Sequence, residues 1–322
     1  MLIRLNQFRF GQNRKSAKRD RNIMAGSTVG FIGLGYMGEG MAANLMAKGN
    51  TLVVMANRRR DAVDRLVAAG AREVASAAEM ASQVDAIFLC VTGSPEVEAI
   101  IEGENGVLSG AKPGLLVIDC STAEPDSTLR LAHVLAAKGA SLVDAPLGGT
   151  PAGAKAGTLQ ALVGASDADF ARAEPLIACW AATIAHVGPV GAGHKMKLIN
   201  NFLSLGYASL YSEALALGAK VGISAETFHS VIGKGRMRCG FYDTFMTYVI
   251  ERDENAHQFT IANAYKDLRY LAGMADNASA VNPLGSAVKN QFAAMAAAGQ
   301  AEKYVPMLSD FVAEANGVKP KR

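Results

Sequence analysis

The first regular pattern in the chain is a short apolar run, Val29 to Ile32, followed by three glycines and then by apolar residues at helical spacing. A short continuous apolar run is typical of a strand that is buried on both faces, as in parallel sheets. Met41, Ala42 and Leu45 recur with the period of a helix that has one apolar face. The pattern therefore predicts a strand, a glycine turn and a helix in that order.

The same alternation continues to about residue 190. The predicted strands are Thr51–Ala56, Asp85–Val91, Leu115–Asp119, Ser141–Ala145, 160–164 and 184–187, and the predicted helices are 60–69, 76–82, one opening at Pro95, 124–138 and 166–178. Strands that alternate with helices indicate a parallel sheet covered by helices. The glycine- and proline-rich segment from Asp144 to Gly157 is predicted as a stiff turn whose exposed amides suit a small anion.

Beyond residue 190 every segment has a helical pattern. His194 to Ala219 contains no proline, and such a helix would be about 40 Å long and would join two domains. Further helices are predicted at 225–233, 241–251, 260–276, 283–298 and after Pro306. We expect an α/β fold with an N-terminal Rossmann-type doubly wound sheet domain over 24–190, followed by an all-α domain over 191–322 for substrate binding and oligomerisation.

Charge changes this picture at the N-terminus. Residues 1–23 carry seven basic residues and one acid, so they contribute +6 to a chain whose net charge is +3, and the remainder is mildly acidic at −3. An acidic body argues against nucleic-acid binding, and no apolar run is long enough to span a membrane. Residues 1–23 have one serine and a poor amphipathic pattern, which favours a disordered basic leader on a cytoplasmic protein over a transit peptide. The scattered cysteines and histidines predict no metal site.

Gly33, Gly35 and Gly38 form the pattern G-x-G-x-x-G at the predicted turn from strand to helix. The first glycine permits the tight turn, the second lets backbone approach a pyrophosphate, and the third lets helix and strand pack closely. The N-terminus of the helix supplies N–H groups and a positive dipole end to the phosphates. A glycine-rich turn without function is the alternative, but the placement between strand and helix favours a dinucleotide site.

The end of the second strand bears on which dinucleotide is bound. An NAD-binding fold usually carries an acid about 20 residues beyond the glycines to hold the ribose 2′-hydroxyl, whereas this chain reads Asn57-Arg58-Arg59-Arg60 before its first acid, Asp61. Asn57 can hydrogen-bond the ribose, and the guanidinium of Arg58 can bind a 2′-phosphate. Arg59 and Arg60 are more simply a solvated charge run. We expect NADP(H) in preference to NAD(H).

Polar residues follow other predicted strands, where such sheets bind ligands. Ser121 and Thr122 come directly after the strand that ends at Asp119. They are candidates for cofactor or substrate contact, and a helix-capping role is the alternative. On the long helix, Lys197 and Asn201 are four residues apart and therefore share one face.

Five motifs occur in order over about residues 28–318: GFIGLGYMG (30–38), DCST (119–122), DAPLGG (144–149), GAGHKMKLINN (191–201) and YKDL (265–268). With these motifs the chain resembles the β-hydroxyacid dehydrogenases, the family of 3-hydroxyisobutyrate dehydrogenase, tartronate semialdehyde reductase and succinic semialdehyde reductases. The resemblance implies an oxidoreductase that uses NADP(H) or NAD(H) to interconvert a small β- or γ-hydroxy acid and its semialdehyde or keto form.

The resemblance also implies roles for individual residues. It places Lys197 as the catalytic general acid and base, with Asn201 as its partner. It places Ser121, Gly148, Gly149 and Asn201 at the substrate. The cofactor is expected to contact Gly33, Leu34, Gly35, Tyr36, Met37, Gly38, Asn57, Arg58, Val91, Thr92, Thr122 and Lys266.

The chain departs from the family pattern at a few positions. The family pattern D-A-P-V-S-G-G contains a serine that helps to hold the substrate carboxylate. In this chain that serine is replaced by Gly148. The usual glutamine after G-x-G is His194. Arg236 and Arg238 lie in a loop near the substrate mouth, where they could meet a second acidic group, although surface arginines are the simpler interpretation. These departures leave the reaction type intact and the substrate open.

Two other function classes compete with a dehydrogenase. An imine reductase looks similar but usually has another residue at the lysine position, and a non-catalytic dinucleotide-binding scaffold would lack the catalytic lysine. Lys197 and the DCST motif favour the dehydrogenase. The helical half is rich in alanine, leucine and methionine, more than one small domain would bury alone. Together with the resemblance, this predicts a homodimer or homotetramer.

Overall fold

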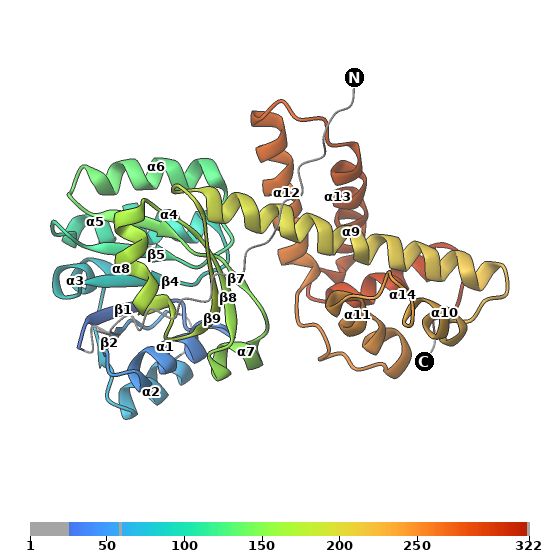
Figure 1. Ribbon diagram of the computed structural model, residues 1–322, viewed down its shortest axis with the longest axis horizontal. Helices are drawn as coiled ribbons and strands as arrows, with labels where there is room; N and C mark the ends of the chain where they lie inside the picture. Colours follow the sequence, from blue (N-terminus) through green and yellow to red (C-terminus); the bar gives the residue numbers. More distant parts are fainter. Residues whose placement is uncertain (1–25, 58–59, 321–322) are drawn as a thin grey trace, which may run out of the picture.

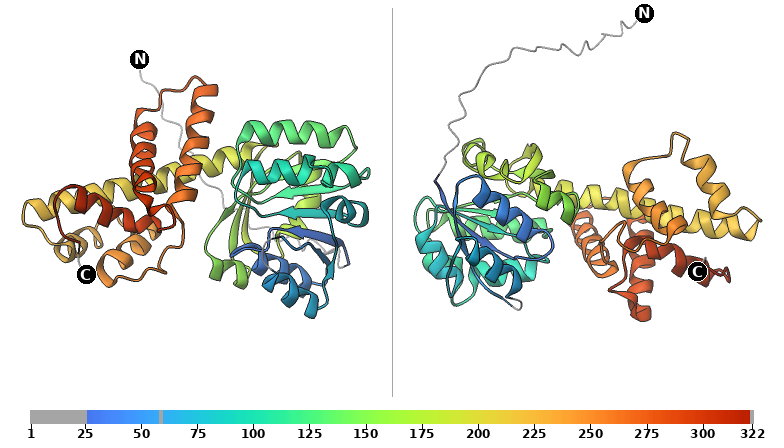
Figure 2. Two further views of the ribbon diagram at one scale, coloured as in Figure 1. Left: turned by 180° about the vertical axis from the view of Figure 1, so that it is seen from behind. Right: turned by 90° about the horizontal axis from the view of Figure 1, so that it is seen from below.

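The computed structural model describes residues 26–57 and 60–320. The basic leader expected over 1–23, and Arg58, lie outside these described residues. The chain forms a sheet domain and a helical domain, and the long helix α9 (Ala192–Lys220) runs from one into the other (Figures 1 and 2). The predicted fold class, a Rossmann-type sheet followed by helices on a long connecting helix, is confirmed.

The sheet has the strand order β3-β2-β1-β4-β5-β6-β8-β7. Strand β9 lies off this path and also pairs with β8. The pairs among the first six strands are parallel, whereas β8 runs antiparallel to β6 and β7. The strands are β1 (Thr28–Ile32), β2 (Thr51–Val54), β3 (Arg72–Glu73), β4 (Ala86–Leu89), β5 (Leu116–Asp119), β6 (Ser141–Asp144), β7 (Leu147–Gly148), β8 (Leu159–Gly164) and β9 (Ala181–Gly188). The parallel strands bring the carboxyl ends of β1, β4 and β5 to one edge, which faces the helical domain (Figure 1).

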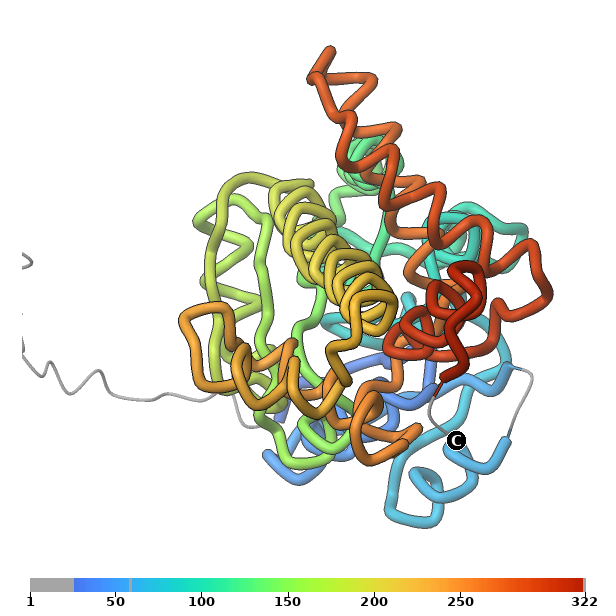
Figure 3. Tube along the Cα trace, turned by 90° about the vertical axis from the view of Figure 1, so that its right-hand side faces the viewer, coloured from blue at the N-terminus to red at the C-terminus, as the bar shows by residue number. Residues whose placement is uncertain are grey.

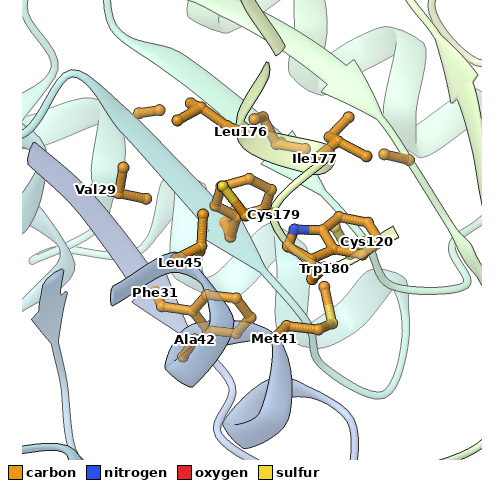
Figure 4. Packing of buried hydrophobic residues seen from close by; sticks show 14 of the residues in the cluster. Val29, Phe31, Met41, Ala42, Leu45, Cys120, Leu176, Ile177, Cys179 and Trp180 are labelled. Carbon is orange, nitrogen blue, oxygen red and sulfur yellow. The ribbon is translucent and has the colours of Figure 1, made fainter. Parts of the chain in front are cut away.

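Helices cover both faces of the sheet, which explains why its central strands are almost continuously apolar. One face carries α1 (Gly38–Ala47), α2 (Asp61–Ala68), α7 (Pro151–Ala156) and α8 (Asp167–Ile177), and the other carries α3 (Ala77–Gln83), α4 (Ser94–Glu102), α5 (Val107–Gly110) and α6 (Pro125–Ala136). In the core between the sheet and helices α1, α2, α7 and α8, the ring of Phe31 stacks on that of Phe88, which lies edge to face with the fully buried Trp180. Figure 4 shows Phe31 and Trp180 in this core.

The helical domain packs around α9. It consists of α10 (Ala225–Ile232), α11 (Gly240–Glu251), α12 (Ile261–Asn277), α13 (Pro283–Met295) and α14 (Leu308–Ala315), with a π turn at Ala296–Gln300 and a 3₁₀ turn at Val305–Met307. Its core includes the fully buried Tyr242, Phe245 and Phe292. Figure 3 looks along the long axis of the molecule and shows α9 between α12 to α14 on one side and α10 on the other.

The prediction of a stiff turn from Asp144 to Gly157 was wrong, because this segment contains strand β7 and helix α7. Thr150 caps α7 by accepting a hydrogen bond from Gly153 N at 3.2 Å, Pro151 occupies the first turn, and Gly157 ends the helix with φ +69°. These are the usual start and stop residues of a helix. The helix is only six residues long, so no helical period was visible in the sequence.

Candidate active site

The glycine turn between β1 and α1 fits a bound dinucleotide. Gly33 has φ +99°, and a Cβ there would overlap the carbonyl of Cys90. A Cβ on Gly38 would overlap the carbonyl of Gly33. A Cβ on Gly35 would meet nothing within 4 Å. Gly33 and Gly38 are therefore required by the fold. Gly35 instead leaves open space beside the helix N-terminus, where a pyrophosphate would lie.

The ends of β4 and β5 meet at Lys266 of α12. The Lys266 ammonium donates hydrogen bonds to the carbonyl of Thr122 at 2.9 Å and to the carbonyl of Thr92. The Ser121 hydroxyl accepts a hydrogen bond from Val91 N at 3.0 Å. Five residues expected at the cofactor or substrate, drawn from both domains, are thus brought together.

Tyr270 lies one turn beyond Lys266 and closes the same junction. Its hydroxyl accepts a hydrogen bond from Ser94 N at 3.2 Å, and its ring centroid lies 5.2 Å from the Lys266 ammonium. A Cβ on Gly93 would lie 2.7 Å from this hydroxyl, so the glycine leaves room for the tyrosine. Sequence reasoning missed Tyr270, although its four-residue spacing from Lys266 places both on one helix face.

Lys197 reaches from α9 to β7. Its ammonium donates a hydrogen bond to the carbonyl of Leu147 at 2.6 Å. Burial lowers the pKa of Lys197 below its ordinary value, and the charge of Lys266 adds to this while Asp267 opposes it. Burial, together with the Lys197 charge, also lowers the pKa of His257 to about 4. The positive charge of Lys197 therefore lies in a poorly solvated part of the site.

Asn201 is tied to α12. The side chain is 6% exposed, and its amide donates a hydrogen bond to the Asp267 carboxylate at 2.6 Å. The other oxygen of Asp267 lies 3.1 Å from the Lys266 ammonium. Asn201, Asp267 and Lys266 thus form a polar chain across the helical side of the site, with Lys197 one turn before Asn201 on the same helix.

His194 anchors the first turn of α9 to the sheet, and sequence reasoning did not give it this role. Its side chain is fully buried, Nε2 donates to the carbonyl of Ser121 at 3.1 Å, and Nδ1 lies 2.7 Å from the hydroxyl of Thr128. The position of Lys197 is thereby linked to the loop that carries Ser121.

Asp144, at the end of β6, holds the same turn from the other side. Its carboxylate accepts hydrogen bonds from Gly191 N at 2.6 Å and from His194 N at 2.7 Å. Burial raises the pKa of Asp144. A carboxylate at a helix N-terminus satisfies N–H groups that have no partner inside the helix, so α9 begins at a defined point beside the sheet.

The remaining candidates lie around this centre. Asn57 is exposed beyond β2. Arg60 forms ion pairs with Asp64 and Glu73 on the surface, which agrees with its interpretation as part of a solvated charge run. Arg238 pairs with Asp243 and is exposed.

The fold and the site together define a two-domain oxidoreductase that uses a nicotinamide dinucleotide. Comparison with known proteins agrees. Residues 28–188 match the NAD binding domain of 6-phosphogluconate dehydrogenase, and residues 191–307 match the NAD-binding domain of NADP-dependent 3-hydroxyisobutyrate dehydrogenase.

Individual relatives show which family of oxidoreductases the chain belongs to. The chain is 39% identical over 241 residues to 2-(hydroxymethyl)glutarate dehydrogenase of Eubacterium barkeri, covering 74% of this chain and 79% of that protein. It is 28% identical to the solved Mycobacterium tuberculosis 3-hydroxyisobutyrate dehydrogenase with L-serine, with a TM-score of 0.80 over 89% of this chain and 99% of that one. The chain belongs to the β-hydroxyacid dehydrogenase family, as its motifs predicted.

Imine reductases are more distant neighbours. The solved enzyme from a Pseudomonas species is 20% identical, with a TM-score of 0.56 over 89% of this chain and 99% of that one, and so shares the fold. The prediction of an enzyme that acts on the CH–OH group of hydroxy acids with a nicotinamide cofactor is confirmed. None of the helices in the described part of the chain is both long and apolar enough to cross a membrane.

Proposed function

We propose that this enzyme uses NADP(H) to interconvert a small β- or γ-hydroxy acid and its semialdehyde, with Lys197 as the proton donor and acceptor. The bound cofactor supplies or receives the hydride. Reduction of a carbonyl leaves negative charge on its oxygen, and a proton donor must lie within about 3 Å of that atom. The observation that carries the proposal is the Lys197 ammonium, held at β7 between the two domains.

The lowered pKa of Lys197 supports this role in both directions. In reduction the ammonium donates its proton to the carbonyl oxygen, and in oxidation the neutral amine takes the proton from the hydroxyl. A general acid and base works best when its pKa lies near the operating pH, and burial moves this lysine in that direction.

The substrate carboxylate is assigned to Ser121 and to the backbone around Gly148 and Gly149. The Ser121 oxygen accepts from Val91 N, so its O–H remains a donor for an anion. The names of two relatives, 2-(hydroxymethyl)glutarate dehydrogenase and 3-hydroxyisobutyrate dehydrogenase, both describe carboxylic acids with a hydroxymethyl group. We infer a substrate of this class.

The preference for NADP(H) rests on the end of β2. The first acid after that strand is Asp61, which opens α2, so no carboxylate before it would repel a 2′-phosphate. Arg60 is already engaged by Asp64 and Glu73. This leaves Asn57, and Arg58 outside the described residues, as the groups assigned to the ribose and its phosphate.

A row of exposed apolar residues along α9 supports the expected oligomer. They are Met196, Ile199, Leu203, Leu210 and Leu217 of the helix and Val221 directly after it. Contiguous exposed apolar surface marks an interaction site. Light scattering should give at least twice the chain mass, and Leu203→Glu with Leu210→Glu should shift the protein towards a monomer; a monomeric wild type at micromolar concentration would contradict this part of the proposal.

The function is tested by following NADPH and NADH oxidation with a panel of carbonyl compounds. The panel contains succinic, methylmalonic and tartronic semialdehydes, glyoxylate and a cyclic imine. We expect turnover with at least one semialdehyde, faster with NADPH than with NADH. Turnover of the imine alone would overturn the proposed reaction, and so would the absence of turnover with every compound.

A further inference from the structure

Gly148 stands where the family pattern has a serine, and a second residue occupies the space of the missing side chain. Gly148 of β7 pairs directly with Gln160 of β8 in antiparallel register. A Cβ on Gly148 would lie 3.1 Å from Gln160 Oε1 and 3.4 Å from Gln160 Cβ. Directly paired residues place their side chains on the same face of a sheet, so the glutamine amide lies over the glycine.

The backbone does not by itself demand a glycine at this position. The left-handed backbone conformations in this segment occur at Gly149 and Gly157, whereas Gly148 lies in strand β7. An L-residue could adopt the conformation of Gly148, and the side chain of Gln160 is what would crowd it. Glycine at 148 and glutamine at 160 are thus a matched pair.

The face on which Gln160 lies is the face that carries α9. Alternate residues of β8, Leu159, Ala161 and Val163, belong to the core of the sheet domain. Gly164 is on the opposite face, where an added Cβ would lie 2.8 Å from Gly193 N at the start of α9. Side chains four residues apart in a strand share a face, so Gln160 points to the same side as Gly164.

Gln160 pairs with the residue that follows the Lys197 contact on β7, and its side chain is free to bind. Lys197 donates its hydrogen bond to the carbonyl of Leu147, the residue before Gly148. Gln160 is exposed, in contrast to the rest of β8. Among the interactions of the described residues, none uses its side-chain amide. An unengaged donor and acceptor therefore lie over Gly148, where the family pattern has a serine hydroxyl, one residue along β7 from the carbonyl that Lys197 contacts.

We propose that Gln160 is a specificity-determining residue whose side-chain amide donates a hydrogen bond to the substrate carboxylate in place of the missing serine. The proposal rests on the proposed function, since it assumes a carboxylic acid substrate beside Lys197. The glutamine starts from the neighbouring strand and ends in an amide, so it presents a longer donor than a serine would. Its carbonyl oxygen offers an acceptor as well, which suits an acid carrying a second polar group.

The direct test compares Gln160→Glu and Gln160→Ala with the wild type. The reactions are NADP⁺-dependent oxidation of 3-hydroxyisobutyrate and of 2-(hydroxymethyl)glutarate and reduction of the semialdehyde panel. Loss of a hydrogen bond to a charged group should raise KM for the acid about 10-fold in Gln160→Ala. A carboxylate facing the substrate carboxylate should raise it about 100-fold in Gln160→Glu. The kcat value should change by less than about 3-fold, and KM for NADP⁺ should not change, because uniform substrate binding is what is lost.

Two further variants separate this role from a structural one. Gln83→Glu, on the far side of the sheet domain at the end of α3, makes the same charge change and should leave KM for the acid unaltered. Gly148→Ser combined with Gln160→Ala replaces the amide by a hydroxyl in the vacated space, and should recover part of the KM lost in Gln160→Ala. Gly148→Ser alone should bind the acid more weakly than the wild type, because the serine meets the Gln160 amide.

The outcomes distinguish the two proposals. If the wild type is active and both Gln160 variants keep KM for the acid within 2-fold of its value, the role of Gln160 is overturned while the proposed function stands. If kcat and KM for NADP⁺ change as much as KM for the acid, the role of Gln160 is likewise overturned. If the wild type turns over no acid or semialdehyde with either cofactor, the proposed function is overturned, and this proposal falls with it.

Discussion

The two domains contribute to the site in different ways. The sheet domain offers mostly backbone: a glycine turn with open space at Gly35, and the carbonyls of Thr92 and Thr122. The helical domain and α9 offer charged side chains, Lys197, Lys266 and Asp267. A backbone cradle suits a cofactor that is common to many enzymes, whereas charged side chains on packed helices suit the chemical step. The comparison predicts that changes in the two domains will affect different kinetic constants.

The largest effect is expected from the helical side. Lys197→Ala removes the proposed proton donor, and turnover should fall by about 10²- to 10⁴-fold, the usual contribution of a general acid. Binding of NADPH should stay close to that of the wild type, because the glycine turn is untouched. Lys195→Ala is the matched control, since Lys195 is exposed two residues away on α9 and its loss should leave turnover unchanged.

Near-normal turnover of Lys197→Ala would contradict the assignment and would direct attention to Lys266. Loss of NADPH binding together with turnover would mean that the lysine supports the fold of the site instead. Both quantities can be measured on one variant, by steady-state kinetics and by fluorescence titration of NADPH.

The next effect is expected from the sheet side. Arg58→Ala should raise KM for NADPH about 10- to 100-fold, because a hydrogen-bonded ion pair to the 2′-phosphate contributes about 1.5–3 kcal/mol. KM for NADH should change little, since NADH lacks this phosphate. Arg60→Ala is the control, because its guanidinium is held by Asp64 and Glu73. A wild type that prefers NADH would contradict the prediction.

Lys266 tests the boundary between the two domains. Lys266→Ala removes hydrogen bonds to the carbonyls of Thr92 and Thr122, and KM for NADPH should rise about 10-fold because charged hydrogen bonds are lost. Tyr270→Phe removes only the hydroxyl that accepts from Ser94 N and should have a smaller effect, about 3-fold. If Lys266→Ala and Tyr270→Phe lowered turnover and cofactor binding to the same extent, this junction would serve folding alone.

The smallest effect is expected from the basic leader. Residues 1–23 carry +6 and no periodic apolar face, so they lack the composition of a folded segment. A chain that starts at Met24 should keep its melting temperature and its turnover. A drop of several degrees in Tm would show that the leader contributes to the folded protein.

The sequence predicted the helices of the helical domain more completely than the elements of the sheet domain. Strands β1, β4, β5 and β6, and the glycine turn, follow from local patterns in which each apolar run or glycine has one dominant structural reason. Short elements such as β7 and α7 were missed because two to six residues show no period.

Within the site, local sequence could place Lys197 and Asn201 on one helix face, but it could not say what that face meets. The contacts of Asn201 with Asp267 and of His194 with Ser121 join residues far apart along the chain. Such contacts depend on how the helices dock on the sheet. The apolar pattern of one helix does not encode that docking. Only the tertiary packing shows which residues of other elements the helix face meets.

The central claim is that one lysine moves the proton in both directions, and the pH dependence of kcat/KM for reduction and oxidation tests it most directly. Burial lowers the pKa of Lys197, so both profiles should bend at one common pKa below that of a free lysine. Reduction needs the ammonium and should fall as pH rises through this value, whereas oxidation needs the neutral amine and should rise. In Lys197→Ala the common bend should vanish from both profiles. Profiles that keep the bend in this variant, or that bend at unrelated values in the wild type, would contradict the account.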